Sequence, residues 1–246
     1  MLHAAQNLLL AASLALIAGG LWMRDRLPGA EAVLPASLPE PTQEPERRAP
    51  FPVSAGGVDY TVSPLYRYEL RGMVVSRHDT SAWWDVVHRD WWSDHLNVVD
   101  LCVVWGETLR SGVHRRMRYA SGTFTCYFAT DDGEAWQRFR PDEISNNHLL
   151  SNDPAIVKRL RGVRPGDQIV VRGALAEYGH AKGGFARGTS IRRDDQGNGA
   201  CETIWVTEAR VLRRANAGWR SALPLGVGGL LLALVLWFVL PPRPVE

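Results

Sequence analysis

Three cysteines and seven histidines are the side chains of this sequence that could act as nucleophiles or bases. Cys201, in the segment GNGACETIWV, could form a nucleophile–base pair with His148, in SNNHLL. In such a pair the imidazole takes the thiol proton and leaves a reactive thiolate. Asp195 and Glu202, which flank the same cysteine, give an alternative pair of carboxylates for acid–base chemistry. Buried structural cysteines are far commoner than catalytic ones, so the sequence by itself favours a structural thiol.

A second polar cluster begins at position 78, HDTSAWWDVVHRDWWSDH, and contains His78, His88 and His95. Imidazoles and the accompanying carboxylates are the ligands of zinc or manganese sites. The spacing does not suit a compact site, because no His-x-x-x-His motif and no paired cysteines accompany these histidines. We therefore predict no metal and no other cofactor, and keep these three histidines as weak candidates for metal ligands.

The same segment carries four tryptophans in two adjacent pairs, Trp83, Trp84, Trp91 and Trp92. Such aromatic pairs can line a ligand groove or a membrane interface. They can equally fold over the open end of a barrel. The sequence favours this structural lid and leaves a binding surface for a ligand or partner as the alternative.

A basic segment, FARGTSIRRDDQGNGA, contains Arg187, Arg192 and Arg193. Basic side chains near aromatic residues are what a single-strand nucleic-acid site requires. Asp194 and Asp195 cancel most of this charge, and the whole chain has a net charge of only +2. We predict a solvated turn here and no nucleic-acid partner.

Apolar runs lie at both ends of the 246-residue chain and predict an anchor at each end. The run 222–240 carries no charge and approaches the roughly 20 residues that a spanning helix needs, so we predict a membrane-spanning helix within 216–246. The run 8–23 has no Lys or Arg before it, unlike a signal peptide, so we predict an uncleaved anchor over 1–26. These two spans make the lipid bilayer a partner and predict a two-pass protein of the bacterial inner membrane.

The side of the membrane is left open by two opposing signals. Arginines follow the first apolar run and precede the second, so the positive-inside rule favours a cytoplasmic central region. Residues 27–57 are rich in proline and predict an extended stalk, which hints at a periplasmic domain.

The central region, 58–215, has a pattern that is mostly strand, with segments rich in β-formers expected at 66–76, 98–106, 122–129, 168–178 and 202–212. One helix interrupts them, with Asp153 as its N-cap, Pro154 at its first position and Gly162 after its end. The resulting order β-β-β-α-β-β is that of an OB-fold. We therefore predict a mainly β protein with a small OB-like barrel flanked by two transmembrane helices, and keep another small barrel or sandwich as the alternative.

Cys102 and Cys126 fall in two of these strands, which the barrel order makes neighbours. They are either buried thiols or a cross-strand disulfide. A disulfide requires an oxidising compartment, so this pair also reports on the side of the membrane.

Several stretches together resemble an uncharacterised group of bacterial membrane-anchored proteins over about residues 24–210. The similar motifs are a PPGVLxPxxP-like stalk, a PVDLxxGWG-like strand, a SANMHLIPAD-like stretch around His148, and RxDxGxGACExxWV at 193–206. The resemblance implies no known activity, but it singles out Asp100, His148, Asp195 and Glu202 as polar positions. The Trp-rich insert at 81–96 and the second membrane span depart from the group, which puts a shared partner in doubt.

These observations favour a non-enzymatic membrane protein, whose tethered domain binds a protein partner or supports a membrane complex. Trp83, Trp84, Trp91, Trp92, Asp100 and Arg193 are its candidate binding residues. The first alternative is a membrane-bound hydrolase that uses Cys201 with His148, or Asp195 with Glu202. The second is single-stranded nucleic-acid binding through the face of the barrel.

Overall fold

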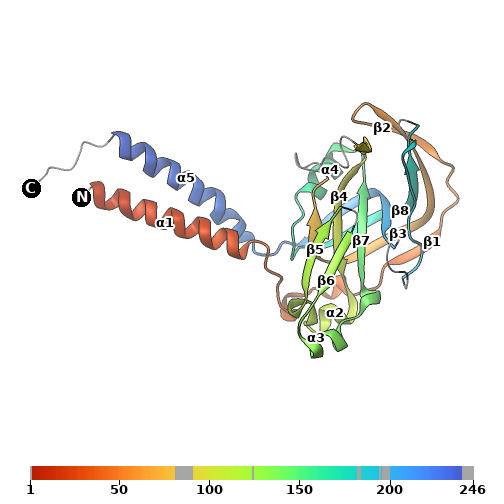
Figure 1. The fold of residues 1–246 in the computed structure, drawn as a ribbon, viewed down its shortest axis with the longest axis horizontal. Coiled ribbons are helices and arrows are strands. Elements are labelled where there is room, and N and C mark those ends of the chain that lie inside the picture. The colour runs from red at the N-terminus through yellow and green to blue at the C-terminus, as the bar shows by residue number, and fades with distance from the viewer. Residues whose placement is uncertain are drawn as a thin grey trace, which may run out of the picture. The chain divides into compact units, whose positions relative to one another are not determined.

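The computed structural model describes residues 2–80, 91–123, 125–181, 184–193, 195 and 200–239 (Figure 1). The chain forms two compact units. One consists of Met1–Arg26 with Ala215–Glu246, and the other is Leu27–Arg214.

The first unit is a pair of apolar helices, α1 (Leu2–Met23) and α5 (Ala217–Val239), which lie side by side in Figure 1. Both are long and apolar enough to cross a membrane. Small residues bring them close together, since a Cβ atom added at Gly226 would lie 2.9 Å from the backbone oxygen of Ser13. Gln6 also donates a hydrogen bond from Nε2 to the backbone oxygen of Ala233, at 3.2 Å. The paired helices agree with the predicted two-pass arrangement.

The second unit is built mainly from strands. They are β1 (Thr42–Pro45), β2 (Phe51–Ala55), β3 (Val58–His78), β4 (Asn97–Val104), β5 (Arg118–Gly122), β6 (Thr125–Ala129), β7 (Ile144–Leu150), β8 (Gln168–Gly179), β9 (Ala186–Arg187) and β10 (Glu202–Arg213). Three helices connect them: α2 (Gly106–Arg110), α3 (Gly133–Arg138) and α4 (Pro154–Arg161).

Eight of the described strands form one mixed sheet in the order β1-β3-β4-β7-β10-β8-β9, with β2 paired to β3. The long strand β3 also pairs with β8, so the hydrogen-bonded path β3-β4-β7-β10-β8 returns to β3. The pairing of β7 with β10 is parallel, whereas the other pairings along this path are antiparallel. The mainly β prediction is therefore confirmed.

The core of the domain lies on one face of these strands and follows their period of two. Alternate residues of β4, Val99, Leu101 and Val103, pack there with Leu149 of β7 and Ile204 of β10. Asp100 and Cys102, which alternate with them, therefore point to the opposite face.

Helix α4 forms as the sequence predicts. The Asp153 side chain accepts hydrogen bonds from the backbone N–H groups of Ala155 and Ile156, and Pro154 follows the cap. Ile156 and Leu160 then pack on the core of the sheet.

The expected third strand, 122–129, is wrong as a member of the main sheet, because β5 and β6 pair only with each other. The strand of the main sheet that follows β4 in the sequence is instead β7, which was not predicted because its sequence, ISNNHLL, is polar. The buried Nδ2 of Asn147 has a partner there, because it donates to the backbone oxygen of Leu101 at 3.0 Å. With β7 as the third strand, the predicted order β-β-β-α-β-β is unchanged.

The proline-rich segment 27–57, expected as an extended stalk, packs against the β domain over much of its length. The amide of Leu34 donates to Gln168 Oε1 at 2.7 Å, and Gln168 Nε2 donates to the backbone oxygen of Ala32 at 2.8 Å. The same segment contributes strands β1 and β2 to the sheet.

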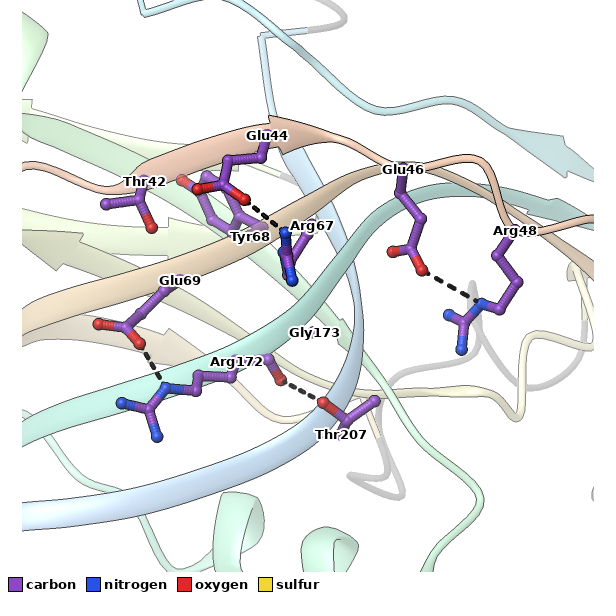
Figure 2. A pocket seen from close by; sticks show the side chains of 10 residues that line it. All are labelled: Thr42, Glu44, Glu46, Arg48, Arg67, Tyr68, Glu69, Arg172, Gly173 and Thr207. Carbon is purple, nitrogen blue, oxygen red and sulfur yellow. Dashed lines mark hydrogen bonds and ion pairs between the residues drawn. The ribbon is translucent and has the colours of Figure 1, made fainter.

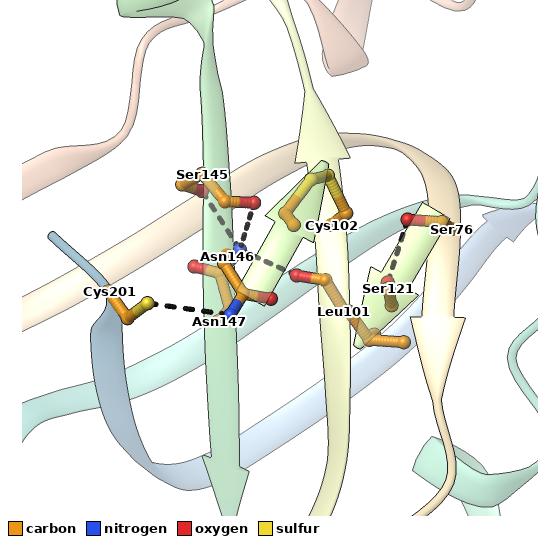
Figure 3. Close-up of a disulfide and its surroundings, with 9 residues drawn as sticks. Ser76, Leu101, Cys102, Ser121, Ser145, Asn146, Asn147 and Cys201 are labelled. Atoms are coloured by element: carbon orange, nitrogen blue, oxygen red, sulfur yellow. Dashed lines mark hydrogen bonds between the residues drawn. A yellow bond between two sulfur atoms is a disulfide. The ribbon is translucent and has the colours of Figure 1, made fainter. Parts of the chain in front are cut away.

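A disulfide between Cys102 and Cys126 ties the β5–β6 hairpin to strand β4, with 5.8 Å between the two Cα atoms. A hydrogen bond between the hydroxyls of Ser121, in the hairpin, and Ser76, in β3, links the hairpin to the sheet a second time, at 2.7 Å (Figure 3). The hairpin and the segment before β1 therefore cover the outer face of β4, where Cys102 packs among apolar side chains.

Loss of this disulfide is expected to destabilise the domain by about 3 kcal/mol, since it closes a loop of 24 residues in the unfolded chain. Urea unfolding of the detergent-solubilised full chain, with and without reductant, measures the change. The double variant C102S/C126S serves as the control and should not respond to reductant. Equal stability of the oxidised and reduced wild type would contradict this expectation.

Candidate functional site

The outer face of β4 and β7 holds a buried acid–base pair. Asp100 of β4 and His148 of β7 lie opposite each other in the strand register. His148 Nδ1 lies 2.6 Å from Asp100 Oδ1, and both side chains are completely buried. Asn97 Nδ2 donates to the same carboxylate oxygen at 2.8 Å, which fixes its position.

Cys201 reaches this pair because β10 runs parallel to β7. Thr203 lies opposite His148 in that pairing, and Cys201 comes directly before the strand. Asn146 Nδ2 donates to Cys201 Sγ at 3.4 Å (Figure 3). Cys201 is also among the groups that raise the pKa of His148. Cys201 and His148, the candidate pair of the sequence, therefore lie on the same face of neighbouring strands, and Asp100 is hydrogen-bonded to the imidazole.

The electrostatics of this cluster favour a charged imidazole. Burial lowers the pKa of His148, but the charge and hydrogen bond of Asp100, with a smaller contribution from Cys201, outweigh it and raise the pKa to about 9. The positive charge of Arg187 lowers the same pKa. His148 is therefore an imidazolium at neutral pH, held by a buried carboxylate.

The chemistry that this arrangement can perform is nucleophilic. Cys201 is partly exposed and lies outside the disulfide that joins the other two cysteines. A thiol beside a positively charged imidazole ionises more readily, and a carboxylate on the second ring nitrogen orients the base. Asp100, His148 and Cys201, which we call the thiol site, thus occupy the places of orienting acid, base and nucleophile.

The alternative pair of carboxylates does not join the thiol site. Glu202 points to the face opposite Cys201 and forms an ion pair with Arg193 at 2.6 Å. Burial raises the pKa of Glu202 to about 7, although the Arg193 charge lowers it. Asp195 accepts a hydrogen bond from Ser190 Oγ at 2.6 Å. Each carboxylate therefore has a partner in the structure itself.

Arg193, a candidate binding residue, makes its contacts with other residues of the same domain. Besides its ion pair with Glu202, its guanidinium lies 5.2 Å from the centre of the Tyr68 ring, which is buried in the core. These contacts fasten the segment before β10 to the sheet. They leave little of this charge for a nucleic acid.

The predicted tryptophan cluster is described only in part. Trp83, Trp84 and His88 lie outside the described residues. Trp91 is 73% exposed, whereas Trp92 packs against Phe185 with 6.0 Å between ring centres. Trp92 also accepts a hydrogen bond at its backbone oxygen from His180 Nε2, at 2.8 Å. This segment and the one that follows β8 therefore meet.

The metal candidates do not form a described site. Within residues 2–80, 91–123, 125–181, 184–193, 195 and 200–239, no group of three or more His, Cys, Asp or Glu side chains is arranged to hold a metal ion. His78 lies opposite Asp100 in the β3–β4 register, and His95 is exposed.

A separate groove of about 550 Å³, which was not predicted from the sequence, lies over strands β1, β3, β8 and β10 (Figure 2). Its charged side chains form ion pairs with each other. Glu44 binds Arg67 at 2.5 Å, and Glu69 binds Arg172. None of its lining residues belongs to the thiol site.

Two residues were not assigned a chemical role from the sequence, namely Asp100 of the thiol site, as the partner of His148, and Asn146, which donates to Cys201. Asn146 and His148 are two residues apart, so they share one face of a strand. In a strand, this two-residue spacing predicts that Asn146 and His148 act on the same face, but the polar sequence ISNNHLL does not predict a strand.

No family model matches the chain, and no curated protein matches it. The resemblance to the uncharacterised membrane-anchored group therefore stays a prediction.

The raised pKa of His148 makes the stability of the domain depend on pH. Because the pKa is about 9 when folded and about 6.5 when unfolded, this stabilisation is complete below pH 6.5 and is lost as the pH rises through 9. Between pH 7.5 and 9.5 we expect the wild type to lose about 2 kcal/mol more than Asp100→Asn. Glu202, with its pKa of about 7, titrates mostly below this window and is present in both proteins, so its effect largely cancels in the comparison.

Urea unfolding of the full chain at both pH values, followed by tryptophan fluorescence, measures this difference. His95→Gln, a substitution at an exposed histidine, should keep the wild-type dependence on pH. Parallel dependences in the wild type and Asp100→Asn would refute the ion pair.

Proposed function

We propose that this chain is a two-pass protein of the bacterial inner membrane whose OB-like domain is a thiol hydrolase. The observation that carries the proposal is the position of Cys201, which lies outside the disulfide, accepts a hydrogen bond from Asn146, and shares the outer face of the sheet with the buried pair of His148 and Asp100. A base within hydrogen-bond reach of a nucleophile, itself oriented by a third group, is the usual construction of a covalent catalyst.

The strand pairings support an OB-like barrel. In OB order, β3, β4, β7, β8 and β10 take the places of strands one to five, and α4 lies between the third and the fourth. The pairing of β3 with β8 brings the first and fourth strands together, and the parallel pairing of β7 with β10 joins the third and fifth.

The position of the thiol site agrees with this assignment. OB-folds bind their ligands on the face of the second and third strands. Asp100 and His148 come from the strands in those places, β4 and β7, and project from the face opposite the core. The β5–β6 hairpin covers the adjoining part of this face at Cys102.

The disulfide supports the periplasmic side of the membrane. Disulfides persist in oxidising compartments and are rare in the cytoplasm. The arginines near the two helices favour the opposite side, but their count is a statistical preference, whereas the Cys102–Cys126 bond is a specific contact of the folded domain. We therefore place the central domain in the periplasm and both short tails in the cytoplasm.

Binding of a protein partner without catalysis is the second candidate function. Two aromatic side chains near the β5–β6 hairpin favour it, since Tyr127 is 59% exposed and Trp136 is 53% exposed. Aromatic residues are enriched in protein interfaces.

Reporter fusions after residue 246 test the topology. With the central domain in the periplasm, we expect a carboxyl-terminal green fluorescent protein to fluoresce and a carboxyl-terminal alkaline phosphatase to be inactive. Active phosphatase, together with reduced Cys102 and Cys126 in cells, would place the domain in the cytoplasm.

Alkylation of the purified full chain with iodoacetamide tests the thiol site. We expect Cys201 of the wild type to react about tenfold faster at pH 7 than in His148→Gln, because the imidazolium favours the thiolate. His95→Gln should react as the wild type does, and Cys201→Ser should not be labelled. The same rate in the wild type and His148→Gln would overturn the proposed function.

A further inference from the structure

We propose that the thiol site catalyses acyl transfer from a thioester, with Asn146 as the donor that stabilises the oxyanion. This inference rests on the proposed function and names its substrate class. Cys201, His148, Asp100 and Asn146 together supply the nucleophile, base, orienting acid and amide donor that acyl transfer requires.

Asn146 is the group that distinguishes carbonyl chemistry from simple thiol reactivity. Its side chain is only 6% exposed, and its Nδ2 donates to Cys201 Sγ at 3.4 Å. Its Oδ1 has no hydrogen-bond partner among the described residues. A carbonyl carbon attacked by Sγ would bring its oxygen close to this buried N–H donor. Thiol–disulfide exchange would make no use of such a donor.

The orientation of Asn146 follows from the sheet. Asn146 and His148 alternate along β7 with Asn147, so both project to the face of Asp100 and Cys201. Asn147 has a different role, because its Nδ2 bonds to backbone and side-chain oxygens of Ser145 and to the Leu101 carbonyl. The two side-chain amides therefore project to opposite faces of β7: that of Asn147 is structural, and that of Asn146 faces Cys201.

The proposed reaction has two balanced steps. The reactive form is the ion pair in which Nε2 of His148, the ring nitrogen that Asp100 does not use, already holds the proton of Cys201. Sγ of this thiolate bonds to the carbonyl carbon of the thioester. The bond from the carbonyl carbon to the leaving sulfur breaks, and the leaving thiolate takes up the proton. Water then attacks the S-acyl group, His148 takes a proton from it and returns one to Sγ, and a carboxylic acid is released.

The leaving group explains why a thioester fits better than an amide. Asp100 holds the proton on His148, whose pKa of about 9 makes it a weaker acid than a free imidazole. An amine must be protonated before it can leave the tetrahedral intermediate, whereas a thiolate leaves without a proton. A site with a strongly held proton therefore favours the thiolate leaving group.

The test uses the full chain purified in detergent and two probes, an acetyl thioester of N-acetylcysteamine and oxidised glutathione. With the thioester we expect a mass increase of one acetyl group on Cys201, and hydrolysis that Cys201→Ser abolishes. Asn146→Ala should lower the turnover number about 100-fold, as loss of one oxyanion donor does elsewhere. Its alkylation by iodoacetamide should change less than threefold.

Asn152→Ala, at an exposed asparagine just after β7, is the matched control and should leave both rates unchanged. If Asn146→Ala does not fold, the acetyl adduct on wild-type Cys201 still decides the question. A mixed disulfide with glutathione and no acetyl adduct would overturn the acyl inference while the thiol site stands. If the alkylation rate of Cys201 does not depend on His148, both the acyl-transfer inference and the proposed function are wrong.

Discussion

The ion pair of Asp100 with His148 is the interaction on which the outer face of the sheet depends. Both groups are withdrawn from water, and removing two charges from water carries a large desolvation penalty. The pair is sustained by a short hydrogen bond and by Asn97, which donates to the same carboxylate. Such a pair persists only where neighbouring strands fix its geometry. The adjacency of β4 and β7 is therefore a requirement of the chemistry as well as of the fold.

The outer face of β4 and β7 is closed on one side and accessible on the other. At Cys102 the disulfide holds the β5–β6 hairpin over β4, and apolar side chains fill the space below it. On the other side of β7, Cys201 is only partly buried (Figure 3). The structure thus shields the charged pair and exposes the sulfur, which is the division of roles that a nucleophilic site needs.

The sequence predicted the features that depend on local patterns. Asp153 and Pro154 begin α4 as expected, and the two apolar ends form helices. It did not predict β7, because a strand that carries polar side chains on a covered face lacks the usual alternation. The fit of residues 27–57 onto the domain was equally hidden, since proline content reports the local conformation of a chain and not the surface on which it packs.

The most direct measurement of the central claim is the pH titration of His148 by NMR, in the full chain labelled with ¹⁵N-histidine and compared with Cys201→Ser. A midpoint near pH 9 that falls when Cys201 is replaced is the result that the thiol site requires. A midpoint at or below that of a free imidazole, unchanged by the substitution, would show that His148 carries no charge beside the sulfur and would contradict the account.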